Sequence, residues 1–412
     1  MHILIVTQYF WPEPFRINDL ALELRERGHT ITVLTGMPNY PGGRLYPGYS
    51  VFHRGKESWH GVTVLRVPLI TRGVNRSWRL ALNYLSFMFS ATLCGSFRCH
   101  GNFDLVFVYE PSPISVGIPG WWLSRLKKAP LMMWVQDLWP ETLRAIGIRS
   151  RIALWSATML SHFIHRRCDR ILVQSKAFIA PLLSQGAALS AIHYLPNWAE
   201  DFYRPLERTD ADDDPVPEAA GFRVLFAGNI GSAQSFETIV DAASRLVDFP
   251  DIHWIVIGDG HQREWLETEL RRRRLESRFH LINWQPVEKM PVYFSFADAL
   301  LVTLRADPVF ALTIPSKIQS YLASGKPLIG ALDGAGADII KESGAGVVGP
   351  AEDAVSLANA VLAIYRMSSA RRAQLGNNGR AYYETHFRRA DLIRQIENRM
   401  RDMIDEYRGN NE

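Results

Sequence analysis

Short apolar runs alternate with segments of helical period along most of the chain. The order begins with HILIVTQYF, NDLALELRERG and HTITVLT, which predict a strand, a helix ended by Gly28 and a second strand. Further strand-length runs are VTVLRVP, DLVFVYE, PLMMWVQD and RILVQS. They are apolar throughout rather than alternating, which is typical of parallel strands covered on both faces. The pattern predicts a doubly wound α/β domain over residues 1–200.

A segment rich in aspartate and proline then interrupts the pattern. ERTDADDDPVPEAAG has no apolar period, and we interpret residues 201–220 as a linker. Six strand-like runs follow, namely FRVLFAGNIG, IHWIVIGDG, RFHLINWQP, DALLVTL, KPLIGAL and GAGVVGP. They predict a second Rossmann-like domain over 221–385, and 386–412 predicts a C-terminal helix free to pack back on the first domain. Ligands of such sheets bind beyond the carboxyl ends of the strands, so we expect two domains facing across a cleft.

Charge divides the 412 residues into a basic and an acidic half. Residues 1–200 hold 21 Lys and Arg against 11 Asp and Glu, whereas the rest hold 25 against 31. A basic N-terminal half indicates a polyanion or an anionic membrane surface as its partner. The three cysteines form no metal or redox spacing, and the start lacks a signal-peptide pattern. These features favour a reducing compartment and the cytoplasm.

One apolar segment, Leu80–Phe97, complicates a purely soluble interpretation. It has 18 residues without a charge between Arg79 and Arg98, slightly fewer than the roughly 20 that span a bilayer. Because it lies between strands of the same predicted domain, a span is disfavoured. Two alternatives remain: a buried crossover helix, or an interfacial helix whose flanking arginines meet lipid phosphates. The second would make the protein peripheral on the inner face of the cytoplasmic membrane.

Polar residues follow several predicted strands of the first domain, at the edge of the sheet where ligands bind. The candidates are Pro12, Glu13, Arg16 and Asn18 after the first strand, Asn39 and Tyr40 after the second, and Glu110, Asp137 and Glu141 after the later two. Carboxylates at the mouth of an apolar sheet need partners, which is why Glu110 and Asp137 are candidates for catalysis. Each group also has a structural interpretation, as a proline turn or, for Asp137, as a helix cap.

The second domain offers candidates for a phosphate-containing ligand. The turn GNIGSAQ places Gly228, Asn229 and Gln234 after a strand, although it is not a GxGxxG fingerprint. Asp259, Trp284 and Gln285 lie in two further strand-end turns, and Trp284 suits either a nucleobase or the core. TIPSKIQSYLASGKP predicts a short helix with Pro315, Ser316 and Lys317 at its start, where bare N–H groups favour an anion. A capped surface helix is the alternative.

Other chemistries lack support in the sequence. The run Arg271–Arg274 ends an amphipathic segment of the acidic half, so a solvated helix end is favoured over nucleic-acid binding. No HExxH, CxxC or P-loop pattern is present, so we expect neither a metal nor another cofactor.

The tandem pattern, the join YLPNWAEDFYRP, the restart VLFAGNIG, the IGDG turn and SYLASGKPLIGA together resemble the GT-B glycosyltransferases of family 4. The likeness covers essentially the whole chain. QYFWPE, VQDLWPETL, AGNIGSAQSFETIVDAA and TIPSKIQSYLASGKP are similar to the branch that transfers N-acetyl-L-fucosamine or related sugars in capsule, O-antigen and exopolysaccharide synthesis. The resemblance implies a UDP-sugar donor in the C-terminal domain, a lipid-linked saccharide acceptor in the N-terminal domain, and a metal-independent retaining transfer.

The chain departs from the family pattern at positions that the resemblance assigns to binding of the donor diphosphate. Two glutamates of many members correspond to Leu312 and Ser320, and an Arg and a Lys correspond to Asn229 and Gln234. Lys317, with Arg305, is then the leading substitute cation, and Ser316, Gln319 and Ser320 are uncharged hydrogen-bonding candidates. Two alternatives stay open: a UDP-sugar epimerase on the same fold, and a non-catalytic subunit that binds nucleotide sugar.

Overall fold

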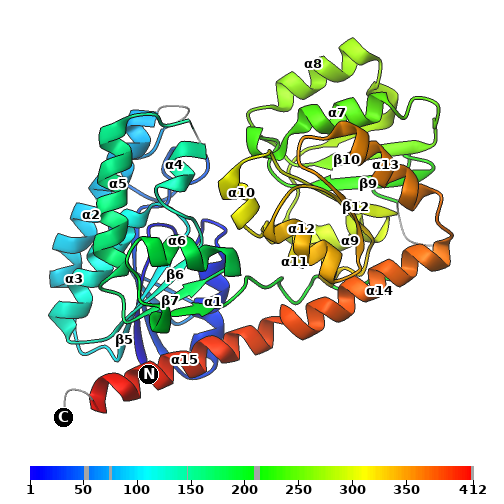
Figure 1. Ribbon diagram of the computed structural model, residues 1–412. Coiled ribbons are helices and arrows are strands. Elements are labelled where there is room, and N and C mark those ends of the chain that lie inside the picture. Colours follow the sequence, from blue (N-terminus) through cyan, green and yellow to red (C-terminus); the bar gives the residue numbers. More distant parts are fainter. Residues whose placement is uncertain (51–54, 74–76, 146, 208–213, 410–412) are drawn as a thin grey trace. The chain divides into compact units, whose positions relative to one another are not determined.

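Parallel strands flanked by helices form two compact units (Figure 1). The computed structural model describes residues 1–50, 55–73, 77–145, 147–207 and 214–409. The first unit comprises Met1–Leu195 with Ile393–Glu412, and the second comprises Pro196–Leu392. Part of the expected linker, 208–213, lies outside the described residues. Two α/β units with mainly parallel sheets confirm the predicted fold class.

The first unit is built on an eight-stranded sheet of order β3-β4-β2-β1-β5-β6-β7-β8. Its strands are β1 His2–Val6, β2 Thr30–Gly36, β3 Lys56–Trp59, β4 Val62–Val67, β5 Leu105–Glu110, β6 Leu131–Val135, β7 Arg170–Val173 and β8 Ile192–Tyr194. The six strands predicted here are present. The sequence pattern missed β3 and β8, because β3 is a polar edge strand held by antiparallel pairing with β4, and β8 has only three residues.

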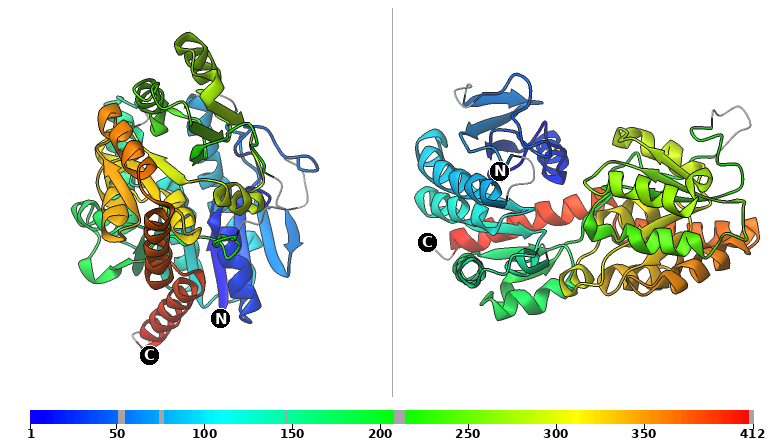
Figure 2. Two further views of the ribbon diagram at one scale, coloured as in Figure 1. Left: turned by 90° about the vertical axis from the view of Figure 1, so that its right-hand side faces the viewer. Right: turned by 90° about the horizontal axis from the view of Figure 1, so that it is seen from above.

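Helices cover both faces of this sheet. They are α1 Arg16–Glu26, α2 Ser77–Arg98, α3 Gly117–Lys127, α4 Glu141–Ala145, α5 Arg151–His165, α6 Ile179–Ser184 and α15 Arg389–Gly409, with the 3-10 turn η1 Ile114–Val116 before α3. Helices α2 and α3 lie side by side on one face (Figure 2). Gly95 allows the close approach of α2 to the sheet, since a Cβ there would lie 2.8 Å from Cδ2 of Leu34.

The second unit has six parallel strands in the order β11-β10-β9-β12-β13-β14. They are β9 Phe222–Ala227, β10 Ile252–Ile257, β11 Phe279–Ile282, β12 Ala299–Thr303, β13 Leu328–Ala331 and β14 Gly346–Gly349, and all six were predicted. The helices are α7 Phe236–Ser244, α8 Arg263–Arg273, α9 Met290–Ser295, α10 Pro308–Leu312, α11 Ser316–Ala323, α12 Ala335–Glu342, α13 Ala354–Tyr365 and α14 Ser369–His386. Val224 and Phe226 belong to one apolar cluster and Leu225 to another, so successive side chains of β9 fill cores on opposite faces.

The last helix, α15, packs on the first unit. The Arg170 guanidinium donates to the carbonyl of Arg399 over 2.7 Å and to Glu406 over 3.0 Å. Glu397 lies 3.0 Å from Nε2 of His29 and also accepts from the guanidinium of Arg27. These contacts join the C-terminal helix to α1, β7 and the loop before β2.

The Glu397 contacts predict a stability effect. Burial alone would raise the pKa of Glu397, but hydrogen bonds from Arg401, His29 and Arg27 hold it at about 2. Because this is below the roughly 4.3 of an unfolded chain, the ionised group stabilises the fold above that pH. The contribution is lost as the pH falls towards 2.

We therefore expect Glu397→Gln to lower the free energy of unfolding at pH 7 by about 1–2 kcal/mol and to speed amide exchange in α15. Asp405→Asn, on the exposed side of the helix, is the matched control. Denaturant titration at pH 7 and pH 3 is the measurement. Equal stability of the two variants at pH 7 would contradict the role of Glu397.

Candidate functional site

A lysine ammonium lies against the carboxyl end of β9 in the second unit. Lys317 is the second residue of α11, and its Nζ donates to Oε1 of Gln234 over 2.9 Å. The same nitrogen lies 3.7 Å from the centroid of the Phe226 ring. Burial lowers the pKa of Lys317 to about 7. Its hydrogen-bond partner is a neutral amide and not a carboxylate. A bound anion would therefore stabilise the protonated form of the lysine, which burial destabilises.

Two glycine turns, after β9 and β10, lie next to this lysine. Gly228 has φ 144° and Gly258, after β10, has φ 145°. A Cβ on Gly258 would lie 2.0 Å from the carbonyl oxygen of Gly228, so the two turns touch and require glycine. A Cβ on Gly228 would lie 3.2 Å from Nζ of Lys317. The exposed Asn229 follows in the same turn, and the structure therefore brings Gly228, Gln234 and Lys317 together.

The 3-10 turn η4, Ser232–Gln234, connects this group to β12. Thr303 donates to the carbonyl of Gln234 over 2.6 Å, and the backbone N–H of Arg305 donates to the carbonyl of Ala233 over 3.0 Å. Arg305 is half exposed, and its guanidinium lies 3.5 Å from Glu352. A cavity of about 430 Å³ adjoins the turn and is lined by residues that include Ser232, Gln262 and Arg305. The second predicted cation thus lies next to η4, paired with a carboxylate.

The remaining donor candidates divide into exposed and structural groups. Trp284 follows β11 with 67% of its surface exposed, so its ring is open to stacking rather than part of the core. Gln285 follows it and is half-buried, whereas Asp259 is exposed and accepts from the N–H of Gly260. Asp259 follows β10 and the other two follow the edge strand β11, at the ends of the strands where ligands bind in this fold.

The start of α11 presents a mixture of free and occupied groups. Pro315 precedes the first helical residue, and Ser316 is exposed beside it. Gln319 is completely buried. In the orientation that satisfies its amide, its nitrogen donates to the carbonyls of Pro315 and Ser316, so it holds the helix start in place. The half-buried Ser320 accepts through its carbonyl from Ser324.

In the first unit, Glu13 joins two loops at the carboxyl ends of β1 and β2. Its Oε1 accepts from the backbone N–H groups of Asn39 over 2.8 Å and Tyr40 over 2.7 Å, and Oε2 accepts from that of Phe10 over 3.3 Å. Burial raises the pKa of Glu13 to about 7, although these three N–H groups act against the rise. Glu13 therefore positions Asn39 and Tyr40 from within.

Two further carboxyl groups lie at the carboxyl ends of neighbouring strands, Glu110 as the last residue of β5 and Asp137 shortly after β6. Glu110 is completely buried, and its pKa is raised well above the ordinary value by burial and by the nearby charge of Asp137. Burial raises the pKa of Asp137 to about 7. A carboxyl group with such a pKa is suited to exchange or share a proton near neutral pH. The two predicted catalytic carboxylates are therefore neighbours with perturbed acidity.

The other acceptor candidates lie in the same loops. Asn18 accepts from the N–H of Trp11 over 3.0 Å and donates to the carbonyl of Glu13 over 2.7 Å, which folds the loop around Pro12. Arg16 is the first residue of α1 and is half-buried. Glu141 begins α4, and its Oε2 accepts from Gln185 over 3.4 Å.

Sequence reasoning missed several residues of this group. The Arg72 guanidinium lies 4.9 Å from the centre of the Tyr40 ring, and its backbone N–H donates to Oδ1 of Asn39. Tyr84 of α2 interacts electrostatically with Arg72 and Asp137. The sequence did offer a signal for Tyr84, because Asn83 and Tyr84 are polar residues within the apolar segment Leu80–Phe97.

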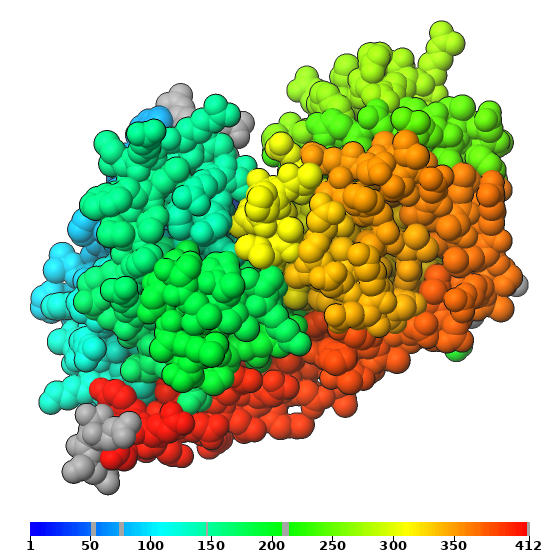
Figure 3. Space-filling model, viewed as in Figure 1, coloured from blue at the N-terminus to red at the C-terminus, as the bar shows by residue number. Residues whose placement is uncertain are grey.

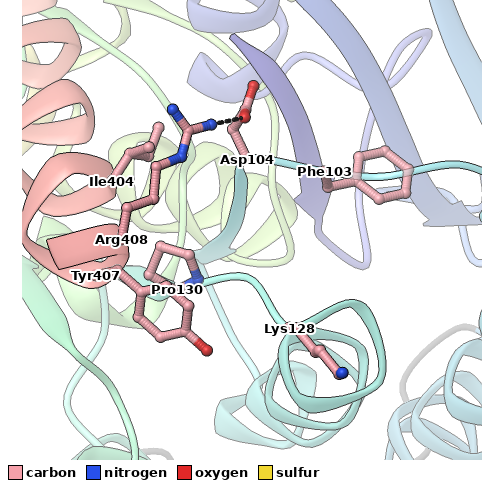
Figure 4. Close-up of a pocket in the computed structure, with 7 residues that line it drawn as sticks. All are labelled: Phe103, Asp104, Lys128, Pro130, Ile404, Tyr407 and Arg408. Atoms are coloured by element: carbon pink, nitrogen blue, oxygen red, sulfur yellow. Dashed lines mark hydrogen bonds and ion pairs between the residues drawn. The ribbon is translucent and has the colours of Figure 1, made fainter. Parts of the chain in front are cut away.

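A separate cavity lies at the amino ends of the first sheet (Figure 4). It has a volume of about 290 Å³, and the ion pair between Arg408 and Asp104 lies at its wall. It is away from the acceptor candidates of the same unit, because those lie at the carboxyl ends of the strands. Within the described ranges, no three His, Cys, Asp or Glu residues gather as metal ligands. Arg272 and Arg273 pair with Glu269 at the end of α8.

Comparisons with known proteins match both units. Residues 15–198 match the glycosyl transferase 4-like domain, and residues 209–382 match the glycosyl transferases group 1 domain. The putative colanic acid biosynthesis glycosyl transferase WcaI of Escherichia coli (strain K12) is 25% identical over 339 residues, which are 79% of this chain and 82% of that protein.

Solved structures share the whole architecture. HepE from Anabaena, in complex with UDP, superimposes with a TM-score of 0.70 at 16% identity, over 98% of this chain and 100% of that chain. Sucrose-phosphate synthase from Thermosynechococcus elongatus gives 0.77 at 17% identity, over 98% and 99%. Two matched domains on this shared architecture show that the chain is a GT-B glycosyltransferase, composed of a glycosyl transferase 4-like domain and a glycosyl transferases group 1 domain.

Proposed function

We propose that the protein is a retaining glycosyltransferase of bacterial surface polysaccharide synthesis. It moves N-acetyl-L-fucosamine or a related N-acetylated deoxy sugar from a UDP-sugar to a polyprenyl-diphosphate-linked saccharide. The observation that carries the proposal is the desolvated Lys317 ammonium beside Gln234 and the glycine turn of β9. The similarity to WcaI, named for colanic acid biosynthesis, supports the polysaccharide assignment. HepE, solved with UDP and with UDP-glucose, supports a UDP-sugar donor.

The donor diphosphate would occupy the space between the β9 turn and the start of α11. When the bond between C1 and the phosphate oxygen breaks, the bonding pair leaves with UDP and negative charge grows on the β-phosphate. Lys317 would neutralise that charge directly, with the N–H groups of the turn and Ser316 as further donors. Gln234 replaces the cation of many family members and would hold the lysine instead. No metal ion is part of this proposal.

The acceptor hydroxyl would be positioned in the first unit. A new bond forms between that oxygen and C1 on the face that the phosphate leaves, and the hydroxyl proton passes to the departing phosphate. Asp137, whose carboxyl pKa is raised by burial, would hydrogen-bond the sugar hydroxyls without a full buried charge. The completely buried Glu110 would act through Asp137 rather than touch the sugar. Tyr40, whose backbone is fixed by Glu13, would contact the sugar from the opposite loop, and the buried Asn39 would hold that loop in place.

A lipid-linked acceptor also implies a place of action. We propose that the protein works as a peripheral protein on the cytoplasmic face of the membrane, where an anionic surface would attract its basic first half.

The reaction is tested by incubating each of a series of UDP-sugars with polyprenyl-diphosphate-GlcNAc and by measuring the products by mass spectrometry. We expect one deoxy-N-acetyl sugar to be added to the acceptor, with NMR showing the anomeric configuration of the donor. A parallel incubation without acceptor tests the alternatives. Conversion of the UDP-sugar alone would indicate an epimerase, and donor binding without any product would indicate a non-catalytic subunit.

The role of Lys317 predicts the effect of its removal. Lys317→Ala and Lys317→Met are expected to lower kcat by on the order of 10²-fold, because the leaving phosphate loses its cation. Lys341→Met, at an exposed position of α12, is the control and should retain wild-type kinetics. Since the Lys317 amine is desolvated, the similarly sized Lys317→Met should keep the folding stability of the wild type. Wild-type kcat in both Lys317 variants would remove this residue from the mechanism.

The lowered pKa predicts a pH dependence of UDP binding. In the free protein Lys317 loses its proton above about pH 7, whereas the UDP phosphate is already ionised there because its last pKa is about 6. UDP affinity measured by calorimetry should therefore fall between pH 7 and 9, by up to about tenfold per pH unit. Lys317→Met should bind UDP weakly and without this slope. A flat wild-type profile would mean that the ammonium does not contact the diphosphate.

A further inference from the structure

The outer face of α2 is unusually apolar for a helix on a protein surface. Phe97 is 71% exposed, Phe89 67% and Leu93 64%. With Trp78, Leu82 and Leu85 they recur every three or four positions, so they form one stripe along the helix. The opposite side packs on the protein through buried residues such as Phe87 and Ala91. The helix thus has two apolar sides, one of which the first unit leaves uncovered.

Helices α3 and α5 extend the stripe into a wider face. The indole nitrogen of Trp122 in α3 donates to Ser96 of α2 over 2.8 Å, and the rings of Trp121 in α3 and Phe163 in α5 lie 4.9 Å apart. The additional exposed side chains are Trp122 and Leu126 on α3, and Ile152, Trp155 and Met159 on α5. In the space-filling view these helices form part of the cyan-to-teal surface of the first unit (Figure 3).

The concentration of apolar surface on these helices is marked. Among the residues that the structure describes, 21 large apolar side chains are exposed, and 11 of them lie on α2, α3 and α5. The other ten are spread over loops and helices of both units. Scattered exposed apolar residues are normal, but a contiguous face of this kind marks an interaction surface.

Charge on the same helices identifies the occupant. Helices α2, α3 and α5 contain no Asp or Glu, whereas they include Arg79, Arg98, Arg125, Lys127 and Arg151. Their flanking segments add the exposed basic residues Lys128, Arg149, Arg166 and Arg167. Two copies of such a face would bring like charges together. An anionic bilayer instead offers phosphates to the basic residues and acyl chains to the apolar ones.

By length and composition, helix α2 could also cross a bilayer. Its most apolar 18 residues have a mean hydropathy of 1.3, and 22% of this stretch is buried. Its connections favour lying on the membrane instead. It joins β4 to β5, which belong to one parallel sheet. Gly95 also lies so close to Leu34 and Leu123 that a Cβ would overlap them. Lipid cannot surround a helix packed in this way.

The inner side of the same helix reaches the acceptor loops. Asn83 accepts from Gln8 after β1 over 2.6 Å and donates to the carbonyl of Ile70 over 2.7 Å. Tyr84 packs edge-on against Trp139 after β6. A membrane contact on the outer side of α2 would therefore lie one helix away from the proposed acceptor site.

We propose that the outer faces of α2, α3 and α5 form a docking surface for an anionic phospholipid bilayer. The exposed apolar side chains insert at the level of the upper acyl chains, and the arginines and lysines around them meet the lipid phosphates. This docking surface deepens the proposed function and rests on it for the identity of the acceptor, because it assigns the part of the chain through which a lipid-linked substrate would be reached.

The test is flotation of the full-length protein with vesicles of phosphatidylcholine alone or with 30% phosphatidylglycerol. We expect binding to the anionic vesicles that weakens with salt. The triple variant Phe89→Ser/Leu93→Ser/Phe97→Ser and the charge variant Arg125→Gln/Lys127→Gln/Lys128→Gln should each lose on the order of 10²-fold in partition coefficient. The control variant Val247→Ser/Val292→Ser/Val355→Ser removes three half-exposed apolar side chains of the second unit and should bind like wild type.

A site-specific probe guards against misfolding. A polarity-sensitive fluorophore on Leu93→Cys, in a Cys94→Ser background, should shift to the blue with anionic vesicles, and one on Val355→Cys should not. Equal vesicle binding by the triple variant and wild type, or no shift at position 93, would overturn the docking surface. A dimer in sedimentation velocity that the triple variant abolishes would assign the face to a second copy and would also overturn it.

Failure of the docking surface is distinguishable from failure of the proposed function. Transfer to a water-soluble, short-chain diphosphate-linked acceptor without vesicles should be the same for the triple variant and wild type. Vesicle binding without transfer to any lipid-linked acceptor would leave the docking surface in place and refute the acceptor. Transfer to a lipid-linked acceptor without vesicle binding would support the acceptor and refute the docking surface.

Discussion

Parallel strands constrain everything else in this protein. Each strand must be followed by a crossover that returns the chain to the other end of the sheet, so the loops after successive strands gather at one edge. The acceptor loops of the first unit follow β1, β2, β5 and β6, and the Lys317 site of the second unit lies at the end of β9. The crossovers are helices, and one of them, α2, serves both the core and the surface. The constraint therefore sets where chemistry can occur as well as how the core is built.

Burial gives both candidate sites their chemical character. Lys317 is held by an amide and a ring face, and its pKa falls to about 7. Burial likewise raises the pKa values of the Asp137 and Glu13 carboxyl groups to about 7. Desolvation penalises the charged form of an acid and of a base alike, so their pKa values converge on the neutral range from opposite sides. Groups in this state respond strongly to a phosphate or a sugar hydroxyl, because the ligand replaces the water they have lost.

Helix α2 shows how one element joins two requirements. Its inner side supplies Asn83 and Tyr84 to the acceptor loops and packs on the sheet, whereas its outer side is a stripe of exposed aromatic and aliphatic residues. A helix that is apolar on all sides normally belongs to a core or a membrane. Here the first unit covers one side of the helix, and the other side is exposed. The basic residues around the exposed stripe favour an anionic membrane as its binding partner.

The order of strands and helices could be read from the sequence, because the apolar runs of parallel strands and the glycines after them are local signals. All twelve predicted strands are present, and β3 and β8 were missed because a polar edge strand and a three-residue strand carry no such signal. The strand-end candidates, including Lys317 and Asp137, could likewise be identified from sequence. Tertiary structure alone decided that Lys317 binds Gln234, 83 positions away, that Glu13 holds Asn39 and Tyr40 from beneath, and that Arg72 and Tyr84 join the acceptor group. It also decided which side of α2 remains exposed. The physical reason is that pairing, burial and the resulting pKa values depend on which distant segments pack together, and local hydrophobic periodicity carries no information about that.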